Sequence, residues 1–195
     1  MERNQILIVG GNGFLGMDLV PRLQKMGYDC LTTSRRRRGS KNYLDLTERN
    51  SIENFCENIQ TLDGVIFLSG KEPQQNLRDL SWEHLQEMSM VHLCGIIWCM
   101  KNLIGKIRSG GFCIFTSSVS AKRGSYDPTY ASFKSGIEGL TRTLARELSP
   151  EIRVNCISPG LIEDSPVFNH MSEDFRKNHI ETTPLKKFCS REEVS

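Results

Sequence analysis

A serine pair, a tyrosine and a lysine carry the clearest chemical potential in this sequence. Ser117 and Ser118 precede a glycine-containing loop, and Tyr130 and Lys134 follow in the segment Tyr-Ala-Ser-Phe-Lys. Residues four positions apart lie on one face of a helix, so Tyr130 and Lys134 can point into the same cleft. An ammonium group beside a phenol favours the phenolate and lowers the pKa of the phenol from its ordinary value of ~10. The pattern predicts a general acid or base at Tyr130, with a serine hydroxyl holding the reacting oxygen.

A helix is the element that must position this pair. Asp127-Pro128 is typical of an N-cap followed by the first helical residue. An apolar stripe at helical spacing then follows at Phe133, Ile137, Leu140 and Leu144. The alternative interpretation is that Tyr130 is a core residue and Lys134 a solvated one, because Tyr-x-x-x-Lys alone is a weak signal. The neighbouring motifs must decide between these two interpretations.

A glycine-rich turn near the N-terminus indicates a nucleotide site. The short apolar run Gln5–Val9 is typical of a parallel strand buried on both faces, and a helix through about Met26 follows the turn. Glycines in such a turn let backbone N–H groups approach a pyrophosphate at the helix N-terminus. We therefore predict dinucleotide binding, rather than a purely structural turn, at Gly10, Asn12, Gly13, Phe14, Leu15 and Gly16.

The end of the second predicted strand, at about residues 29–33, favours NADP. An acid at this position binds the ribose hydroxyls of NAD, whereas arginine accommodates the 2′-phosphate of NADP. The chain has Ser34 and Arg35 here, with Arg36 as a second candidate contact, so NADP is preferred and NAD is the alternative cofactor. Four consecutive arginines also fit a nuclear-localisation or nucleic-acid patch. The strand-end position favours the cofactor for the first two, and a solvated loop is expected for Arg37 and Arg38.

Apolar runs and helical stretches alternate along the rest of the chain. Short strands are expected at 42–47, 65–68, 112–116 and 152–157. Thr47 is expected to cap the helix that follows the first of these, and Ser81 to cap a helix through about Ile107. His92 lies on the apolar side of that helix, where a core role is commoner than a catalytic one. We predict an α/β fold, a Rossmann-like doubly wound parallel sheet, in a single domain spanning residues 1–195.

Composition narrows the classes of function further. Lys and Arg number 25 against 23 Asp and Glu, and this net charge of +2 gives no global basic field for nucleic acid. The seven cysteines are scattered without metal-type spacing, as expected for reduced thiols in a cytoplasm. The N-terminus leads into an apolar run too short for a signal peptide or a membrane span. We expect a cytoplasmic protein with no metal, no nucleic-acid partner and no membrane partner.

Six motifs in this order resemble the short-chain dehydrogenase/reductase family over nearly the whole chain. They are Gly10–Gly16, Leu44–Thr47, Leu68–Gly70, Ser117–Val119, Tyr130–Lys134 and Arg153–Gly160. The resemblance implies NAD(P)-dependent oxidoreduction of a small-molecule alcohol/carbonyl pair. In that scheme Tyr130 transfers the proton, Lys134 lowers its pKa and binds the nicotinamide ribose, and a serine orients the substrate oxygen. Further cofactor contacts are implied for Asp45, Leu46, Ser69, Gly70, Pro159, Gly160 and Ile162.

Some residues depart from the family pattern. The glycine spacing is similar to that of the extended or atypical branches, whereas everything after Ser117 is similar to the main reductase branch. His92 stands where the family has an asparagine that supports a proton-relay water, and Asp164 stands where a threonine contacts the nicotinamide amide. Flanking residues favour Ser118 as the catalytic serine, and counting back from Tyr130 favours Ser117.

The leading hypothesis is an NADP-dependent carbonyl reductase with Ser118, Tyr130, Lys134 and His92 as catalytic residues. One alternative is a non-catalytic NADP-binding regulator or sensor, and another is a nucleotide-sugar or deoxysugar reductase or epimerase. Residues 161–183 are expected to form a substrate lid. The resemblance implies a final strand beyond Ser195, so we expect a truncated chain. It also implies a homodimer or homotetramer paired through the helices at 81–107 and 127–148.

Overall fold

A parallel sheet forms the centre of the protein. The computed structural model describes residues 4–36 and 38–195, so the expected solvated loop position of Arg37 lies outside the described residues. The strands are β1 (Gln5–Val9), β2 (Asp29–Thr32), β3 (Leu62–Phe67), β4 (Ile107–Thr116) and β5 (Arg153–Ile157). They pair in the order β2-β1-β3-β4-β5, and every pairing is parallel. This arrangement confirms the predicted α/β class, because parallel strands require crossover connections.

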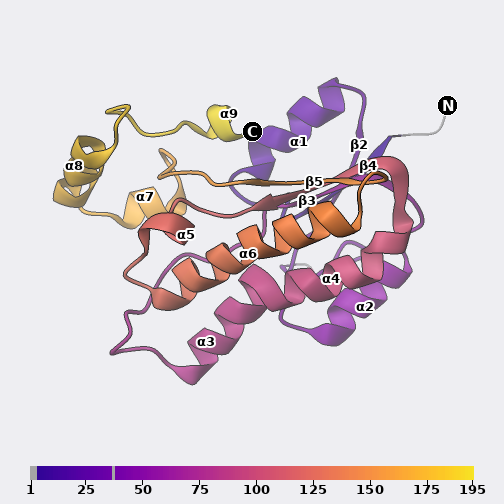
Figure 1. Ribbon diagram of the computed structural model, residues 1–195, viewed down its shortest axis with the longest axis horizontal. Coiled ribbons are helices and arrows are strands. Elements are labelled where there is room, and N and C mark those ends of the chain that lie inside the picture. Colours follow the sequence, from indigo (N-terminus) through magenta and orange to yellow (C-terminus); the bar gives the residue numbers. More distant parts are fainter. Residues whose placement is uncertain (1–3, 37) are drawn as a thin grey trace.

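Helices cover both faces of the sheet. The longer elements are α1 (Gly16–Lys25), α2 (Arg49–Glu57), α3 (Trp82–Ser89), α4 (Gly95–Leu103), α6 (Pro128–Glu147) and α8 (Glu173–Thr182). The shorter ones are η1 (Met90–Cys94), η2 (Ile104–Lys106), α5 (Ser120–Arg123), α7 (Pro166–His170) and α9 (Arg191–Val194). In Figure 1, α1 and α9 lie above the strands, and α2, α4 and α6 lie below them. The protein is therefore a three-layer α/β domain.

Two apolar clusters hold these layers together. The larger joins the sheet to α2, α4 and α6 through side chains such as Phe55, Phe67 and Leu103. The smaller joins the other face to α1, where Ile6 and Ile8 are fully buried. The unbroken apolar run of β1 is thus explained by burial on both faces.

The expected strand at 42–47 is wrong. Among the described residues, a single bridge between Ser34 and Tyr43 forms there, and Glu48 rather than Thr47 is the N-cap of α2. The Asp45 carboxylate accepts hydrogen bonds from the backbone and the hydroxyl of Thr47, at 2.9 and 2.7 Å. Such local side-chain bonds compete with a strand ladder, so this segment folds as a turn.

The long helix expected from Ser81 to Ile107 is interrupted. Ser81 does cap α3, accepting a hydrogen bond from the backbone of His84, but η1 inserts a π-helical turn before α4. This stretch, Trp82–Lys106, is the one described helix long and apolar enough to cross a membrane by length and composition. It supplies Met88, Cys99 and Leu103 to the interior of the domain, which accounts for its apolar character.

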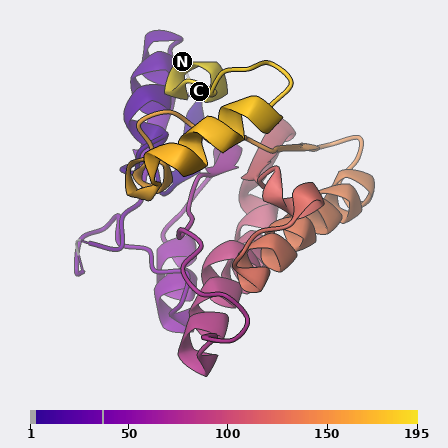
Figure 2. The ribbon, with the colours of Figure 1, turned by 90° about the vertical axis from the view of Figure 1, so that its left-hand side faces the viewer.

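The segment after β5 lies at the carboxyl ends of the strands. Ile162 forms an isolated bridge with Cys189, and the loops between them carry α7 and α8. Figure 2 shows α8 lying across this end of the domain. In open α/β sheets this is the end where ligands bind, and a lid at residues 161–183 stays a prediction.

Candidate active site

The N-terminus of α6 brings the tyrosine and the lysine to the carboxyl end of the sheet. Asp127 is the N-cap as predicted, and its Oδ1 accepts hydrogen bonds from the backbone N–H groups of Thr129 and Tyr130 at 2.9 and 3.2 Å. Pro128 occupies the first helical position. One turn later, Lys134 lies on the same side of α6 as Tyr130, with Nζ 5.8 Å from the centre of its ring. The two side chains do share one site.

Lys134 is buried, contrary to the alternative of a solvated lysine. Its side chain lies at the end of β4, where Nζ donates a 2.7 Å hydrogen bond to the carbonyl oxygen of Thr116. Burial lowers the pKa of the Lys134 ammonium to about 8. Because a buried lysine costs free energy, this position is explained better by a role in binding or chemistry than by packing.

The expected fall in the pKa of Tyr130 is wrong for the protein without ligands. Burial raises the pKa of the Tyr130 phenol, and the nearby Glu72 carboxylate raises it further, while Ser118 acts in the opposite direction. Loss of water around the phenolate thus outweighs the hydrogen bond with Ser118. The phenol is consequently protonated at neutral pH, which suits a proton donor.

The two serines point in different directions. The Ser117 hydroxyl donates a 2.9 Å hydrogen bond to the carbonyl oxygen of Lys134, so it ties β4 to the backbone of α6. The Ser118 hydroxyl lies close enough to the phenol of Tyr130 to lower its pKa. This geometry favours Ser118 as the residue that faces a reacting oxygen, and gives Ser117 a structural role.

His92 reaches the site from the π-helical turn η1. Its ring meets that of Tyr130 edge to face, with 5.3 Å between the centres, and its Nε2 lies 3.0 Å from the carbonyl oxygen of Lys71. Burial and the charge of Lys134 lower the pKa of the His92 imidazole to about 3. A neutral ring is therefore present at pH 7, and its Nδ1 is buried without a partner in the described part of the chain.

The glycine turn has the shape that a dinucleotide requires. Gly10 has φ +81°, and a Cβ there would lie 2.9 Å from the backbone nitrogen of Ser69. A Cβ on Gly16 would lie 2.0 Å from the carbonyl oxygen of Gly11. Among the described residues, the N–H groups of Phe14 and Leu15 have no acceptor, and Ser69 Oγ is buried without a partner. These groups fit a bound pyrophosphate and its ribose.

The arginine predicted for the 2′-phosphate lies at the surface after β2. Arg35 is more than half exposed, and its guanidinium lies 3.7 Å from the carboxylate of Glu87 on α3. Ser34 accepts a hydrogen bond from the backbone of Arg36 at 3.2 Å. Arg35 is free to turn toward a phosphate because an exposed ion pair of this length is weak.

The remaining predicted cofactor residues lie on three loops at the same end. Asp45 is held by its local turn, Leu46 is buried in the larger core, and Gly70 lies next to the ring of His92.

The third loop follows β5. The carbonyl of Pro159 accepts a hydrogen bond from the backbone of Val119, which joins this loop to the loop that carries Ser118. Gly160 is exposed, and Ile162 is buried. Asp164 is exposed with φ +58°.

Sequence reasoning missed a buried acid–imidazole pair beneath Tyr130. His84 Nε2 lies 2.9 Å from Asp127 Oδ2, and both side chains are almost fully buried. Burial raises the pKa of Asp127, but hydrogen bonds from Thr129, Gln74, His84 and Tyr130 outweigh it and hold that pKa far below its ordinary range. His84 falls on the buried face of α3, a signal that also fits an ordinary core residue.

A second missed contact joins the C-terminal segment to the glycine turn. The guanidinium of Arg191 lies over the ring of Phe14 at 5.0 Å, and its Nε is buried without a partner among the described residues. Nothing in the spacing of the sequence connects two residues so far apart.

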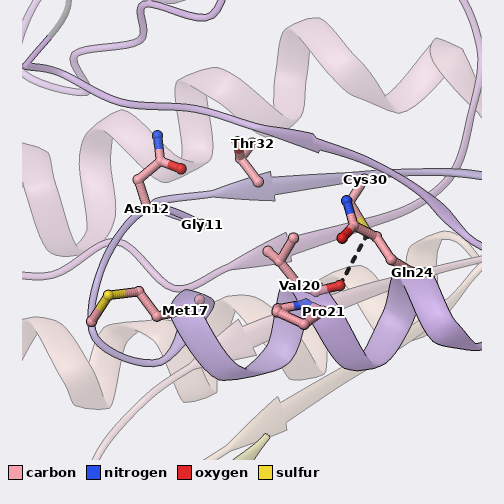
Figure 3. Close-up of a pocket in the computed structure, with 9 residues that line it drawn as sticks. Gly11, Asn12, Met17, Val20, Pro21, Gln24, Cys30 and Thr32 are labelled. Atoms are coloured by element: carbon pink, nitrogen blue, oxygen red, sulfur yellow. Dashed lines mark hydrogen bonds between the residues drawn. The ribbon is translucent and has the colours of Figure 1, made fainter.

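Two cavities in the described part of the chain lie away from Tyr130, and the first of them includes Asn12 and Gly16 of the glycine turn. One of about 320 Å³ lies between α1 and β2, where Gly11, Val20, Cys30 and Thr32 line it (Figure 3). The other, of about 340 Å³, lies between α6 and β5. Neither is lined by Tyr130 or Lys134, so neither is the cleft of the proposed chemistry.

Comparisons with known proteins agree with the fold. A family model described as "Enoyl-(Acyl carrier protein) reductase" matches residues 31–195. The chain is 26% identical to an acetoacetyl-CoA reductase from Synechocystis, over 100% of this chain and 86% of that protein. It is 33% identical to a D-xylose 1-dehydrogenase from Caulobacter vibrioides, over 61% of this chain and only 50% of that protein. A solved small-chain dehydrogenase in complex with NADPH has a TM-score of 0.84 at 23% identity, covering 98% of this chain and 87% of that one.

Proposed function

The chain belongs to the short-chain dehydrogenase/reductase family, and we propose that it is an NADP-dependent oxidoreductase acting on the carbonyl or alcohol group of a small molecule. The observation that carries the proposal is the convergence of a buried Lys134, a protonated Tyr130 and Ser118 at the carboxyl end of β4. The glycine turn lies at the same end of the sheet.

Each side chain has a separate task in the reduction. When bound, NADPH supplies the hydride. Ser118 holds the carbonyl oxygen of the substrate, and Tyr130 donates its phenolic proton to that oxygen as negative charge develops. Lys134 lies beneath the ring of Tyr130 and stabilises the phenolate that remains. His92 keeps the backbone of Lys71 and the ring of Tyr130 in place, since its neutral imidazole contacts both.

The proposal assigns NADP as the preferred cofactor. Arg35 follows β2 at the position that distinguishes the two dinucleotides, and no acid stands beside it in the sequence. The solved neighbour that holds NADPH supports binding of this cofactor by the shared fold. NAD is the alternative that direct binding measurements would detect.

The proposal also includes a cytoplasmic location. All seven cysteines are free, and Cys56, Cys99 and Cys113 are buried in the interior. Free thiols in these numbers are typical of a reducing compartment.

The test is conversion of Tyr130 to phenylalanine. Tyr130→Phe keeps the ring and removes the proton, so reduction of a responsive carbonyl should fall about 10²–10⁴-fold, with NADPH affinity within a few-fold. NADPH oxidation over a carbonyl panel measures turnover, and fluorescence titration measures affinity. Tyr28→Phe, which removes a hydroxyl far from the site, is the control. Tight NADPH binding without turnover in the parent protein would favour a cofactor-binding regulator instead.

A further inference from the structure

The loop after β3 is hydrogen-bonded to residues that surround Tyr130. We define the strap as residues 71–75, which leave the sheet at Gly70 and lead toward α3. At one end, the backbone N–H of Lys71 lies 3.2 Å from Nε2 of His92. At the other end, the N–H groups of Gln74 and Gln75 donate to Asp127 Oδ2 at 2.9 and 3.3 Å. Both anchors are groups that contact or cap Tyr130, so the strap is fixed against the proton donor.

Glu72 lies between these anchors. The residue before it is bonded to His92, and the carbonyl of Pro73 after it accepts a hydrogen bond from Tyr126, four residues before Tyr130. The Glu72 carboxylate acts on the phenol of Tyr130, whose pKa it raises. Hydrogen bonds on either side of it, to His92 and to Tyr126, therefore hold Glu72 at the edge of the site around Tyr130.

One of the two oxygen atoms of the Glu72 carboxylate is available to a ligand. Oε2 of Glu72 lies 3.0 Å from Nδ1 of His170, at the end of α7 in the lid segment. Oε1 has no hydrogen-bond partner among the described residues, and the side chain is about one third exposed. An ionised carboxylate only accepts hydrogen bonds, so the free oxygen calls for a donor on the ligand.

The lysine next to Glu72 does not neutralise it. Lys71 turns its ammonium to Glu87 on α3, forming a short ion pair there. Among the described residues, the basic side chain that contacts the Glu72 carboxylate is the exposed His170. The Glu72 side chain thus offers a substrate a hydrogen-bond acceptor rather than a positive charge.

We infer that Glu72 selects substrates with a hydroxyl group next to the reacting carbonyl, that is, hydroxy-carbonyl compounds of the sugar or polyol type. This inference rests on the proposed function and narrows it. A site that hydrogen-bonds a substrate hydroxyl rejects the analogue that lacks it, because its own polar group is then left unpaired. A β-keto acid would place a second negative charge near Glu72 and is disfavoured for that reason.

A matched pair of ketones tests the inference. Hydroxyacetone and 2-butanone differ by one hydroxyl in place of one methyl. The parent protein with NADPH should show a kcat/KM about 10–100-fold higher for hydroxyacetone, as expected for a hydrogen bond to a charged group. Glu72→Leu should reduce this ratio to near one, whereas Glu72→Gln, which keeps an acceptor oxygen but loses the charge, should retain only part of it, about 2–10-fold. Glu57→Leu, at the exposed end of α2 and outside the expected lid, should leave the ratio unchanged.

A binding measurement keeps the inference separate from the proposed function. Xylitol titrated by calorimetry into Tyr130→Phe protein saturated with NADP⁺ should bind, and the added Glu72→Leu change should weaken binding about 10-fold or more. This result would stand even if no carbonyl were turned over. Equal kcat/KM for the two ketones, an unchanged ratio in Glu72→Leu, or a preference for an acetoacetyl thioester or for aminoacetone over hydroxyacetone would each overturn the inference.

Discussion

At the scale of single residues, Lys134 imposes a cost on folding that depends on pH. Burial lowers its pKa from 10.5 to about 8, so below pH 8 the folded protein carries the full penalty of a buried charge. Between pH 8 and 10.5 the unfolded chain binds more protons than the folded protein, and the stability contribution of this group rises with pH. Lys134 is thus retained against stability, as expected of a functional group.

Lys134→Met provides the first prediction. At pH 7 the variant gains by removing a buried charge and loses one hydrogen bond to Thr116. The parent protein gains stability between pH 8 and pH 10.5 because its Lys134 pKa is lowered from 10.5 to about 8, whereas the variant has no such group. The unfolding free energy of the variant minus that of the parent should therefore fall by about 3 kcal/mol between pH 7 and pH 10.5. Urea unfolding at both pH values measures it. Lys177→Met, at an exposed site on α8, should show no such pH dependence, and a constant difference for Lys134→Met would contradict the prediction.

Arg35→Ala tests the cofactor preference at the residue scale. Loss of charge-assisted hydrogen bonds to a 2′-phosphate removes roughly 1.5–3 kcal/mol, so NADPH should bind about 10–100-fold more weakly. NADH affinity should stay nearly constant, because NADH has no 2′-phosphate. Fluorescence titration with both cofactors provides the measurement. Arg38→Ala, whose guanidinium pairs with Glu48 at 3.0 Å, is a control arginine in the same loop. Equal affinity of the parent protein for NADPH and NADH would refute the assignment.

At the scale of elements, α6 and the strap depend on one buried carboxylate. Asp127 caps α6, accepts from two backbone N–H groups of the strap and lies against His84. Asp127→Ala would leave His84 and the strap without their acceptor, so we expect a loss of about 3–5 kcal/mol in unfolding free energy. Ser172→Ala, which removes the cap of α8, should cost only about 1 kcal/mol.

The same variant has a kinetic signature. Because the strap and the first turn of α6 are both anchored on Asp127, kcat should fall in folded Asp127→Ala protein at low temperature, where most molecules are native. Ser172→Ala should not change kcat. A stability cost below about 1 kcal/mol for Asp127→Ala would show that the buried pair is not what holds the strap.

The sequence predicts those elements whose signals are local. The apolar run of β1, the Asp127-Pro128 cap and the glycine turn each follow from a few adjacent residues, and each is found in the structure. The π-helical turn at Met90–Cys94 does not follow from periodicity, because tertiary contact imposes it. A Cβ on Gly95 would lie 2.3 Å from the carbonyl oxygen of Leu46, so the helix passes close to that loop.

The residues of the candidate site also divide into those with a local sequence signal and those without one. Tyr130 and Lys134 are four residues apart on one helix, so their proximity was predictable from spacing alone. Glu72 and His84 reach the site through a loop and through packing of α3 on α6, and neither leaves a periodic signal. The pKa of Tyr130 was mispredicted because proximity to an ammonium can be read from sequence, whereas loss of solvent cannot.

At the scale of the whole molecule, the layer of α2, α4 and α6 leaves one large apolar side chain exposed among the described residues. Ile97 on α4 is 42% exposed, although α4 otherwise packs into the larger core. α4 and α6 lie side by side on one face of the molecule (Figure 1). A two-fold axis beside these helices would place the same face of a second copy against them, which is the simplest closed assembly.

Ile97→Glu tests this pairing of two copies. We expect light scattering after gel filtration to give the parent protein a mass of at least twice 22.2 kDa at micromolar concentration. Ile97→Glu should lower the mass toward one protomer, because a charge at a buried contact is desolvated without a partner. Leu77→Glu is the matched control, since Leu77 is 74% exposed on the loop that precedes α3. A parent mass of one protomer, or equal masses for the two variants, would contradict association through the exposed face of α4.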